Sequence, residues 1–304
     1  MALYLVKRIL QAVIVLLIVS AIVFLLARLT GDPLSLILPQ DAKPEDFENA
    51  RHELGLDKPL YTQYGIFIFN AITGDFGQSI RTQTSVGELI AQRAPNSLSL
   101  SAVSIFFALL IGLPLGVLAA VRRGSFLDGL ARVVALLGQV MPSFFLGIVL
   151  MLIFSVRLGI LPTSGTGSWQ HYILPGLTMG WLISAGVVRL LRSSMLEVLD
   201  SEYIRLARAK GMKERTVIWK HAFRNAFIPV LTFVGLMFAM IIAAAVVVET
   251  VFNWPGLGRL AYEAVMWRDF PVIQASVLIW ALITVVTSLV VDILYVLFDP
   301  RMRV

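Results

Sequence analysis

The chain has 304 residues, of which 58% are hydrophobic and 14% charged, and its formal net charge at pH 7 is +6. A soluble domain carries nearer a quarter of charged residues, so this composition indicates an integral membrane protein. The sequence has no cysteine and three separated histidines, which excludes disulfides and argues against a metal site built by this chain. In a membrane protein an excess of positive charge reflects lysines and arginines on the cytoplasmic loops, so we expect no nucleic-acid partner.

Six apolar stretches are long enough to cross about 30 Å of hydrocarbon, which takes about 20 residues. They predict an all-α polytopic protein with a single transmembrane domain over residues 1–304. The spans cover approximately 9–29, 98–121, 130–156, 172–192, 228–250 and 274–298. The first span is too long for a signal peptide and lacks a small-residue cleavage site, so we interpret it as a retained anchor.

The distribution of charge predicts the orientation of these spans. If the N-terminus is cytoplasmic, most of the 25 lysines and arginines fall on inside segments. Cytoplasmic loops of membrane proteins are enriched in these residues. We therefore expect both termini in the cytoplasm.

Residues 30–95 form a long outer connection that is acidic on balance. Pro44, followed by two acids, suits the start of a helix, and Gly55 suits its end. Apolar residues on one face predict a second helix over 60–73. Ser85–Glu88 has the spacing of a capping box that opens a short third helix. We expect small amphipathic helices on the outer surface here, and no second domain.

Two glycine pairs, Gly112–Gly116 and Gly176–Gly180, have the spacing that lets membrane helices approach closely. Pro114, Pro142 and Pro175 permit kinks at similar depths. We interpret the glycines as packing sites, with a hinge as the alternative. No inverted repeat relates the first three spans to the last three, which disfavours a self-contained secondary transporter.

The longest inside connection, residues 193–227, holds the densest positive charge and is called the basic insert below. A helical pattern with Leu196, Leu199, Tyr203 and Leu206 on one face ends at Gly211, which suits a left-handed helix end. A second helical pattern follows, so we expect helix, glycine corner, helix. From the residues alone, three roles stay open: a solvated loop, a surface on anionic lipid, and a helix docked in a partner's cleft.

Two runs in the insert are more specific than its charge. Residues 203–211 read YIRLARAKG and residues 221–226 read HAFRNA. These runs resemble the EAA loop of ABC importer permeases as found in the peptide-permease branch, although Arg205 and Leu206 replace the generic Glu-Ala. Segments similar to that branch recur along the chain, at Gly31–Pro33, Leu54–Leu60, Gly74–Ser79, Ser168–Pro175, Asn253–Gly258 and Asp269–Pro271. The chain is identified as a member of the dipeptide, oligopeptide, glutathione and nickel permease family.

The resemblance implies a type I ABC importer fold with six transmembrane helices and a cytoplasmic coupling helix in the bacterial inner membrane. It implies a second homologous permease subunit, two ATP-binding subunits, a periplasmic or lipid-anchored solute-binding protein, a peptide substrate and surrounding lipid. ATP and Mg belong to the partner subunits, and no cofactor is expected in this chain, which lacks a phosphate-loop motif. We therefore expect no enzymatic activity in this chain.

Two groups of candidate site residues follow. For the coupling helix, the resemblance implies ATPase contacts at Tyr203, Ala207, Ala209, Lys210, Gly211, Met212 and Arg215. Charged groups in spans are candidates for a pathway, and the pathway or gate set is Glu249, Asn253, Trp254 and Asp292.

Two of these pathway candidates keep alternatives open. For Glu249 two roles stay open: contact with a peptide amine, or anchoring of the loop that follows it. Asp292 has a structural pairing role as its alternative. Helical spacing over 257–267 predicts a helix that covers an outer gate.

Three other functions are weighed against a peptide importer. A permease of the same family can carry nickel or another metal chelate, and a stand-alone secondary transporter needs no ATPase. A membrane enzyme is the third, since Ser164 and Ser168 near His171 superficially resemble a serine-protease cluster. That stretch lies on an outer loop, so we predict no catalytic residue.

Overall fold

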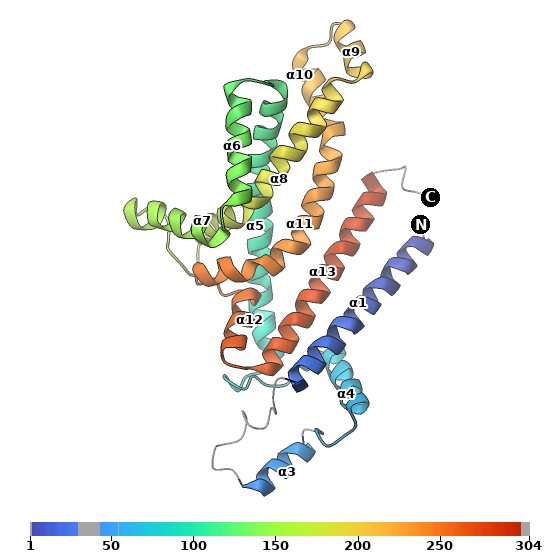
Figure 1. Cartoon of the computed structure of the whole chain (residues 1–304), viewed down its shortest axis with the longest axis vertical. Coiled ribbons are helices and arrows are strands. Elements are labelled where there is room, and N and C mark those ends of the chain that lie inside the picture. The colour runs from blue at the N-terminus through green and yellow to red at the C-terminus, as the bar shows by residue number, and fades with distance from the viewer. Residues whose placement is uncertain (1, 30–42, 54, 299–304) are drawn as a thin grey trace.

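The computed structural model describes residues 2–29, 43–53 and 55–298 (Figure 1). Within these ranges every regular element is helical, apart from one isolated antiparallel bridge between Gln78 and Ser85. Five of the described helices are long and apolar enough to cross a membrane, and a bent pair makes a sixth if it counts as one span. The predicted all-α membrane fold is therefore confirmed.

The α-helices in chain order are α1 (Ala2–Leu29), α3 (Pro44–Glu53), α4 (Leu60–Thr73), α5 (Val86–Val121), α6 (Phe126–Val140), α7 (Ser143–Leu150), α8 (Ile173–Leu199), α9 (Glu202–Ala209), α10 (Glu214–Thr216), α11 (Phe223–Val251), α12 (Leu257–Met266) and α13 (Phe270–Phe298). Three further helical segments are η1 (Met151–Arg157), η2 (Trp169–Tyr172) and η3 (Val217–Ala222). The helix expected over 257–267 is thus present as α12.

The span predicted over 130–156 is not one straight helix. The helix axis bends by 111° between α6 and the segment formed by α7 and η1. Pro142 stands at the break, and Met141 before it has the extended backbone that residues before proline favour. Proline also removes a backbone donor and clashes with the preceding turn, so the helix turns sharply here.

The short helix expected at Ser85–Glu88 is instead the start of a much longer one. α5 continues through Pro95 and Pro114, and the side chain of Ser85 makes no capping hydrogen bond. Val86 and Ile90 are buried in a cluster with residues of α12 and α13. Because both sides of the proline are held by packing, the helix continues across it.

Glycines bring α5 and α8 into close contact. A methyl group added at Gly112 lies 2.7 Å from Cγ1 of Val187, and one added at Gly116 lies 3.0 Å from Cβ of Leu191. Both neighbours are fully buried. The glycine spacing therefore serves helix packing, and α5 has no break at this depth.

The helices form a bundle with two distinct ends (Figure 1). α9 and α10 of the basic insert lie at one end, called the insert end, and α3 and α4 lie at the opposite end. α1 runs away from the insert end beside α13, which runs toward it. α8 packs against α5, α6 and α11, and its C-terminal turns form the start of the basic insert.

Candidate functional site

The basic insert folds as two helical segments joined by a glycine corner at the insert end (Figure 1). α8 ends at Leu199, so the helix expected to run from Leu196 to Gly211 is interrupted at Ser201. There, the Ser201 hydroxyl donates to the carbonyl oxygen of Val198 at 2.5 Å. This break lets α9 leave the axis of α8 and lie beside α10 at the insert end (Figure 1).

The corner is fixed by backbone hydrogen bonds around a left-handed glycine. Gly211 has φ +73°, which confirms the helix end expected there. The Met212 amide donates to the Ala207 carbonyl and the Gly211 amide to the Arg208 carbonyl, the two bonds of a Schellman motif. A methyl group at Gly211 meets nothing within 4 Å, so the backbone angle is what requires glycine here.

α9 buries the face opposite to the one that its apolar pattern indicates. Ile204 and Ala207 are 0% and 8% exposed and pack in the main core, whereas Tyr203 and Leu206 are 45% and 56% exposed. The helical spacing of Tyr203 and Leu206 therefore marks an exposed face of α9. Ala207 packs inside the chain, which removes it from the set of outward contact residues.

The other predicted contact residues divide between surface and core. Tyr203, Ala209, Lys210, Gly211 and Arg215 are exposed on the outer side of the corner, and Met212 is half-buried against the core. Leu206 and Trp219 are also exposed here, and neither was among the predicted contact residues. Together the exposed residues form a mixed apolar and basic surface.

One ion pair crosses the corner. Nη2 and Nε of Arg208 donate to the two carboxylate oxygens of Glu214 at 2.6 and 3.2 Å. The hydrogen bond with Glu214 raises the pKa of Arg208 above its ordinary value. Both side chains are partly exposed, so the pair orients α9 relative to α10 and adds little stability.

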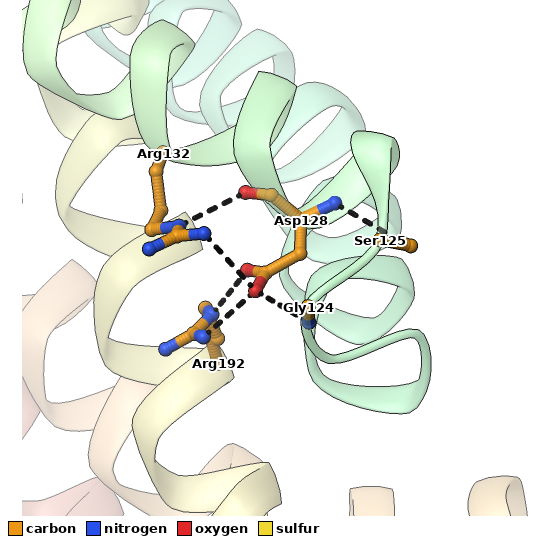
Figure 2. Close-up of polar contacts among 5 residues, drawn as sticks. All are labelled: Gly124, Ser125, Asp128, Arg132 and Arg192. Carbon is orange, nitrogen blue, oxygen red and sulfur yellow. Dashed lines mark hydrogen bonds and ion pairs between the residues drawn. The ribbon is translucent and has the colours of Figure 1, made fainter.

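A buried ion cluster joins α6 to α8 below the insert (Figure 2). The Asp128 carboxylate accepts Nε of Arg192 at 2.7 Å, Nη2 of Arg192 at 3.1 Å and the Gly124 amide at 3.0 Å. Nη2 of Arg132 lies 3.5 Å from the same carboxylate. Asp128 is 1% exposed, and a charge so buried is tolerated because it is paired and hydrogen-bonded.

Sequence reasoning missed this cluster because its two main partners are 64 residues apart. A local signal exists, since Asp128 follows Ser125 by three residues at the start of α6. The Ser125 hydroxyl accepts the Asp128 amide at 3.4 Å, as an N-terminal cap does. A lone acid in an otherwise basic loop is the sequence feature that indicates such a partner.

Glu249 organises a second buried network at the opposite end. Its carboxylate accepts the Ser97 hydroxyl at 2.5 Å and the Arg259 amide at 2.9 Å. The Ser97 hydroxyl in turn accepts the Leu257 amide at 2.7 Å. Leu257 and Arg259 belong to the first turn of α12, whose free amides favour a negative charge. Glu249 is 0% exposed, which favours anchoring of the following loop over contact with a peptide amine.

Trp254 and Asn253 have different roles in the same loop. Trp254 is fully buried, donates Nε1–H to the Asn96 carbonyl at 3.1 Å and packs edge-on against Tyr172. Asn253 is exposed at a turn with φ +51°. Two predicted features lie outside the described part of the chain. They are the side chain of Asp292 and residues Gly31–Pro33 of the first outer motif.

The serine and histidine of the outer loop form a helix cap. Ser168 Oγ lies 2.9 Å from Nδ1 of His171, and the two residues make a capping box at the start of η2. Both side chains are accounted for by this local structure. The described residues contain no group of three or more His, Asp or Glu side chains placed to hold a metal ion.

The sequence matches two family models that together span nearly all of it. Residues 112–304 match the binding-protein-dependent transport system inner membrane component, and residues 1–101 match the N-terminal part of such membrane components. The chain belongs to this family. The permease is therefore a multi-pass inner-membrane component of a transport system.

Curated relatives are similar over the full length. The glutathione transport system permease proteins GsiC of Escherichia coli strain K12 and of Shigella dysenteriae serotype 1 are both 46% identical to the permease. Each comparison spans 301 residues, 99% of this chain and 98% of the relative. The similarity identified from the motifs of the insert and the outer loops is thereby confirmed.

Solved structures support the fold. A chain of the inward-facing MetNI methionine ABC transporter matches with a TM-score of 0.59 at 18% identity, over 69% of the permease and 96% of that chain. A chain of an amino acid ABC transporter with histidines matches with a TM-score of 0.56 at 17% identity, over 71% and 94%. The predicted importer-like fold is confirmed by these likenesses, which at such identities concern the fold alone.

Removing one partner of the buried Asp128 cluster should lower the stability of the fold strongly. Asp128→Ala leaves the Arg192 guanidinium without its acid, so we expect the free energy of unfolding to fall by about 3–5 kcal/mol. Thermal unfolding of the purified permease in detergent measures this. Arg192→Ala combined with Asp128→Ala costs less than the sum of both, because the pair is lost once.

Glu202→Ala is the matched control, since it removes a carboxylate from the exposed pair with Arg205. We expect its melting temperature to equal that of the unmodified permease. Equal melting temperatures for Asp128→Ala and Glu202→Ala show that the cluster does not hold α6 to α8.

The hydrogen bonds to Glu249 should protect the backbone amides in the first turn of α12 from hydrogen exchange. Glu249→Gln leaves at least one amide of the first turn of α12 without a charged acceptor, at a cost of about 1–3 kcal/mol. Hydrogen exchange of Leu257 and Arg259 should accelerate by roughly 5-fold to 100-fold, measured by mass spectrometry of α12 peptides. Glu263→Gln, which removes the partly exposed carboxylate that pairs with the Arg259 side chain, serves as the control, and equal exchange in both variants contradicts the anchoring role.

Proposed function

We propose that the permease is one membrane subunit of an ATP-driven importer for small peptides, such as dipeptides, oligopeptides or glutathione. The 46% identity to glutathione permeases over 99% of the chain carries this proposal. The run Tyr203–Gly211, with its peptide-branch pattern, supports it from the sequence. A solute-binding protein delivers the peptide, and the permease supplies half of the membrane pathway.

The outer surface of the glycine corner is the docking site for an ATP-binding subunit. It consists of Tyr203, Leu206, Ala209, Lys210, Gly211 and Arg215, which are all exposed. Small residues at Ala209 and Gly211 let a partner's backbone approach, while the apolar and basic side chains supply contact area and charge. Two ATP-binding subunits hold ATP and Mg, and the permease contributes no cofactor and no hydrolytic residue.

The buried face of α9 makes the corner a mechanical part. Ile204 and Ala207 pack in the main core, so α9 cannot shift without moving the helices beneath it. α8 precedes α9 directly, and η3 continues into α11 after the corner. Movement of the partner is therefore passed to two spans, and through the Asp128 cluster to α6.

The arrangement of charge and helices supports a definite topology. The insert end faces the cytoplasm, with both termini on that side, because it carries the basic insert. The opposite end, with α3 and α4, faces the solute-binding protein. Large exposed apolar side chains on α1, α6 and α7 fit lipid and a second homologous permease subunit.

Reconstitution tests this function. The complete transporter in proteoliposomes should take up labelled dipeptide or glutathione only with ATP and the solute-binding protein present. Uptake of a nickel chelate in place of peptides overturns the assigned substrate. Uptake by the permease without ATP-binding subunits overturns the importer assignment and indicates a secondary transporter.

Two variants of the corner test docking within the same assay. Gly211→Val places a β-branched residue at φ +73°, and Leu206→Arg places a charge on the exposed apolar contact. We expect either variant to lower uptake at least about tenfold, which is the effect of losing an interface hot spot. The amount of permease inserted in the membrane should be unchanged. Arg123→Ala, on the separate connection between α5 and α6, is the control. Normal uptake in both corner variants contradicts docking at this surface.

A further inference from the structure

Arg189 is an exposed arginine within a membrane-spanning helix. It lies in α8, and its Nη1 donates to Oε1 of Gln139 in α6 at 2.7 Å. Among the described residues it has no carboxylate partner, and the acid of α6, Asp128, is held by Arg192 and Arg132. An uncompensated charge inside a span is costly and marks a water-filled route, a binding site or a missing partner.

The helices on both sides of α8 define where Arg189 points. A methyl group added at Gly138 lies 2.7 Å from Cβ of Ala185, so this side of α8 faces α6. Gly186, the next residue of α8, is crowded by the Phe233 ring of α11. Arg189 follows both positions by one helical turn, so it lies on the narrow part of α8 between α6 and α11. Leu182, seven residues before Arg189 on the same line, is also exposed.

Measured along the helices, the pair lies away from the insert-side ends of α8 and α6. α8 continues for ten residues past Arg189 to Leu199, a rise of about 15 Å. Gln139 is thirteen residues past the start of α6 at Phe126, which is about 20 Å. An arginine near a membrane surface extends its head group toward the water. Arg189 instead reaches back toward Gln139, away from the insert end.

We infer that Arg189 lines the peptide pathway and binds a carboxylate of the peptide in transit, with Gln139 orienting its guanidinium. Gln139 occupies Nη1 only, so Nε and Nη2 are left to form the two-pronged donor that matches a carboxylate. The inference rests on the proposed peptide importer and names the substrate group that this site recognises. Arg189 is thus a specificity residue, because peptides lacking the carboxylate gain nothing from it.

Uptake of matched substrates tests the assignment. Proteoliposomes holding the complete transporter, with saturating solute-binding protein, are supplied with a dipeptide or with the same dipeptide as its C-terminal amide. The selectivity of the solute-binding protein is common to every variant, so it cancels when each variant is divided by the unmodified transporter. Arg189→Gln should slow the free acid about tenfold, the effect of one charge-assisted hydrogen bond, and the amide by less than about twofold.

A second variant keeps the arginine in place. Gln139→Glu supplies a carboxylate that pairs with Arg189 and competes with the peptide, so it too should slow the free acid and spare the amide. Arg123→Gln is the charge-matched control and should alter neither substrate. Melting temperature and the amount of assembled transporter are measured for each variant, and both should stay unchanged.

The outcomes separate this inference from the proposed function. Equal slowing of acid and amide by Arg189→Gln overturns it and indicates a role in assembly or in pairing with an acid of another subunit. Unchanged uptake of the free acid overturns it as well. If the unmodified transporter moves no peptide but carries another solute, the proposed function fails first and the inference falls with it.

Discussion

Because Gly112 and Gly116 let α5 contact Val187 and Leu191 directly, α8 is held through the middle of the bundle, and the rest of the structure is arranged on it. The face of α8 next to α6 carries the arginine that binds Asp128, and another face packs against α11. Its first turn adjoins the Trp254–Tyr172 contact, and its last turn leads into the basic insert. In the proposed mechanism, a displacement at the insert is passed to the helices that pack on α8.

The two buried carboxylates hold opposite ends of this framework by the same physical means. Asp128 is compensated by guanidinium groups near the insert, whereas Glu249 is compensated by a hydroxyl and by the free amides of α12. Each closes a contact between segments that are distant in the sequence. Between these two fixed levels, Arg189 has no acidic partner in the part of the chain that the structure describes, and this observation underlies its proposed binding role.

Apolar run length and charge distribution were sufficient to predict the fold class and most spans, because the bilayer imposes both. The two prolines behave differently: the chain takes the bend that proline favours at Pro142, whereas helix α5 passes Pro95 because Val86 and Ile90 are held by packing, which the sequence does not reveal. The glycine corner was predictable from the backbone requirement of Gly211. The buried face of α9 was not, since Leu206 and Ile204 are equally apolar and their exposure depends on which side meets the core.

The most direct test of the docking account uses the absence of cysteine from the chain. A single cysteine at Lys210, on the exposed corner, should form a short bifunctional cross-link to an ATP-binding subunit, and ATP should change its yield. Ile204→Cys, which is buried, should give none. Cross-linking from Ile204 but not from Lys210, or a yield at Lys210 no higher than that of a cysteine on the α3–α4 end, contradicts the account.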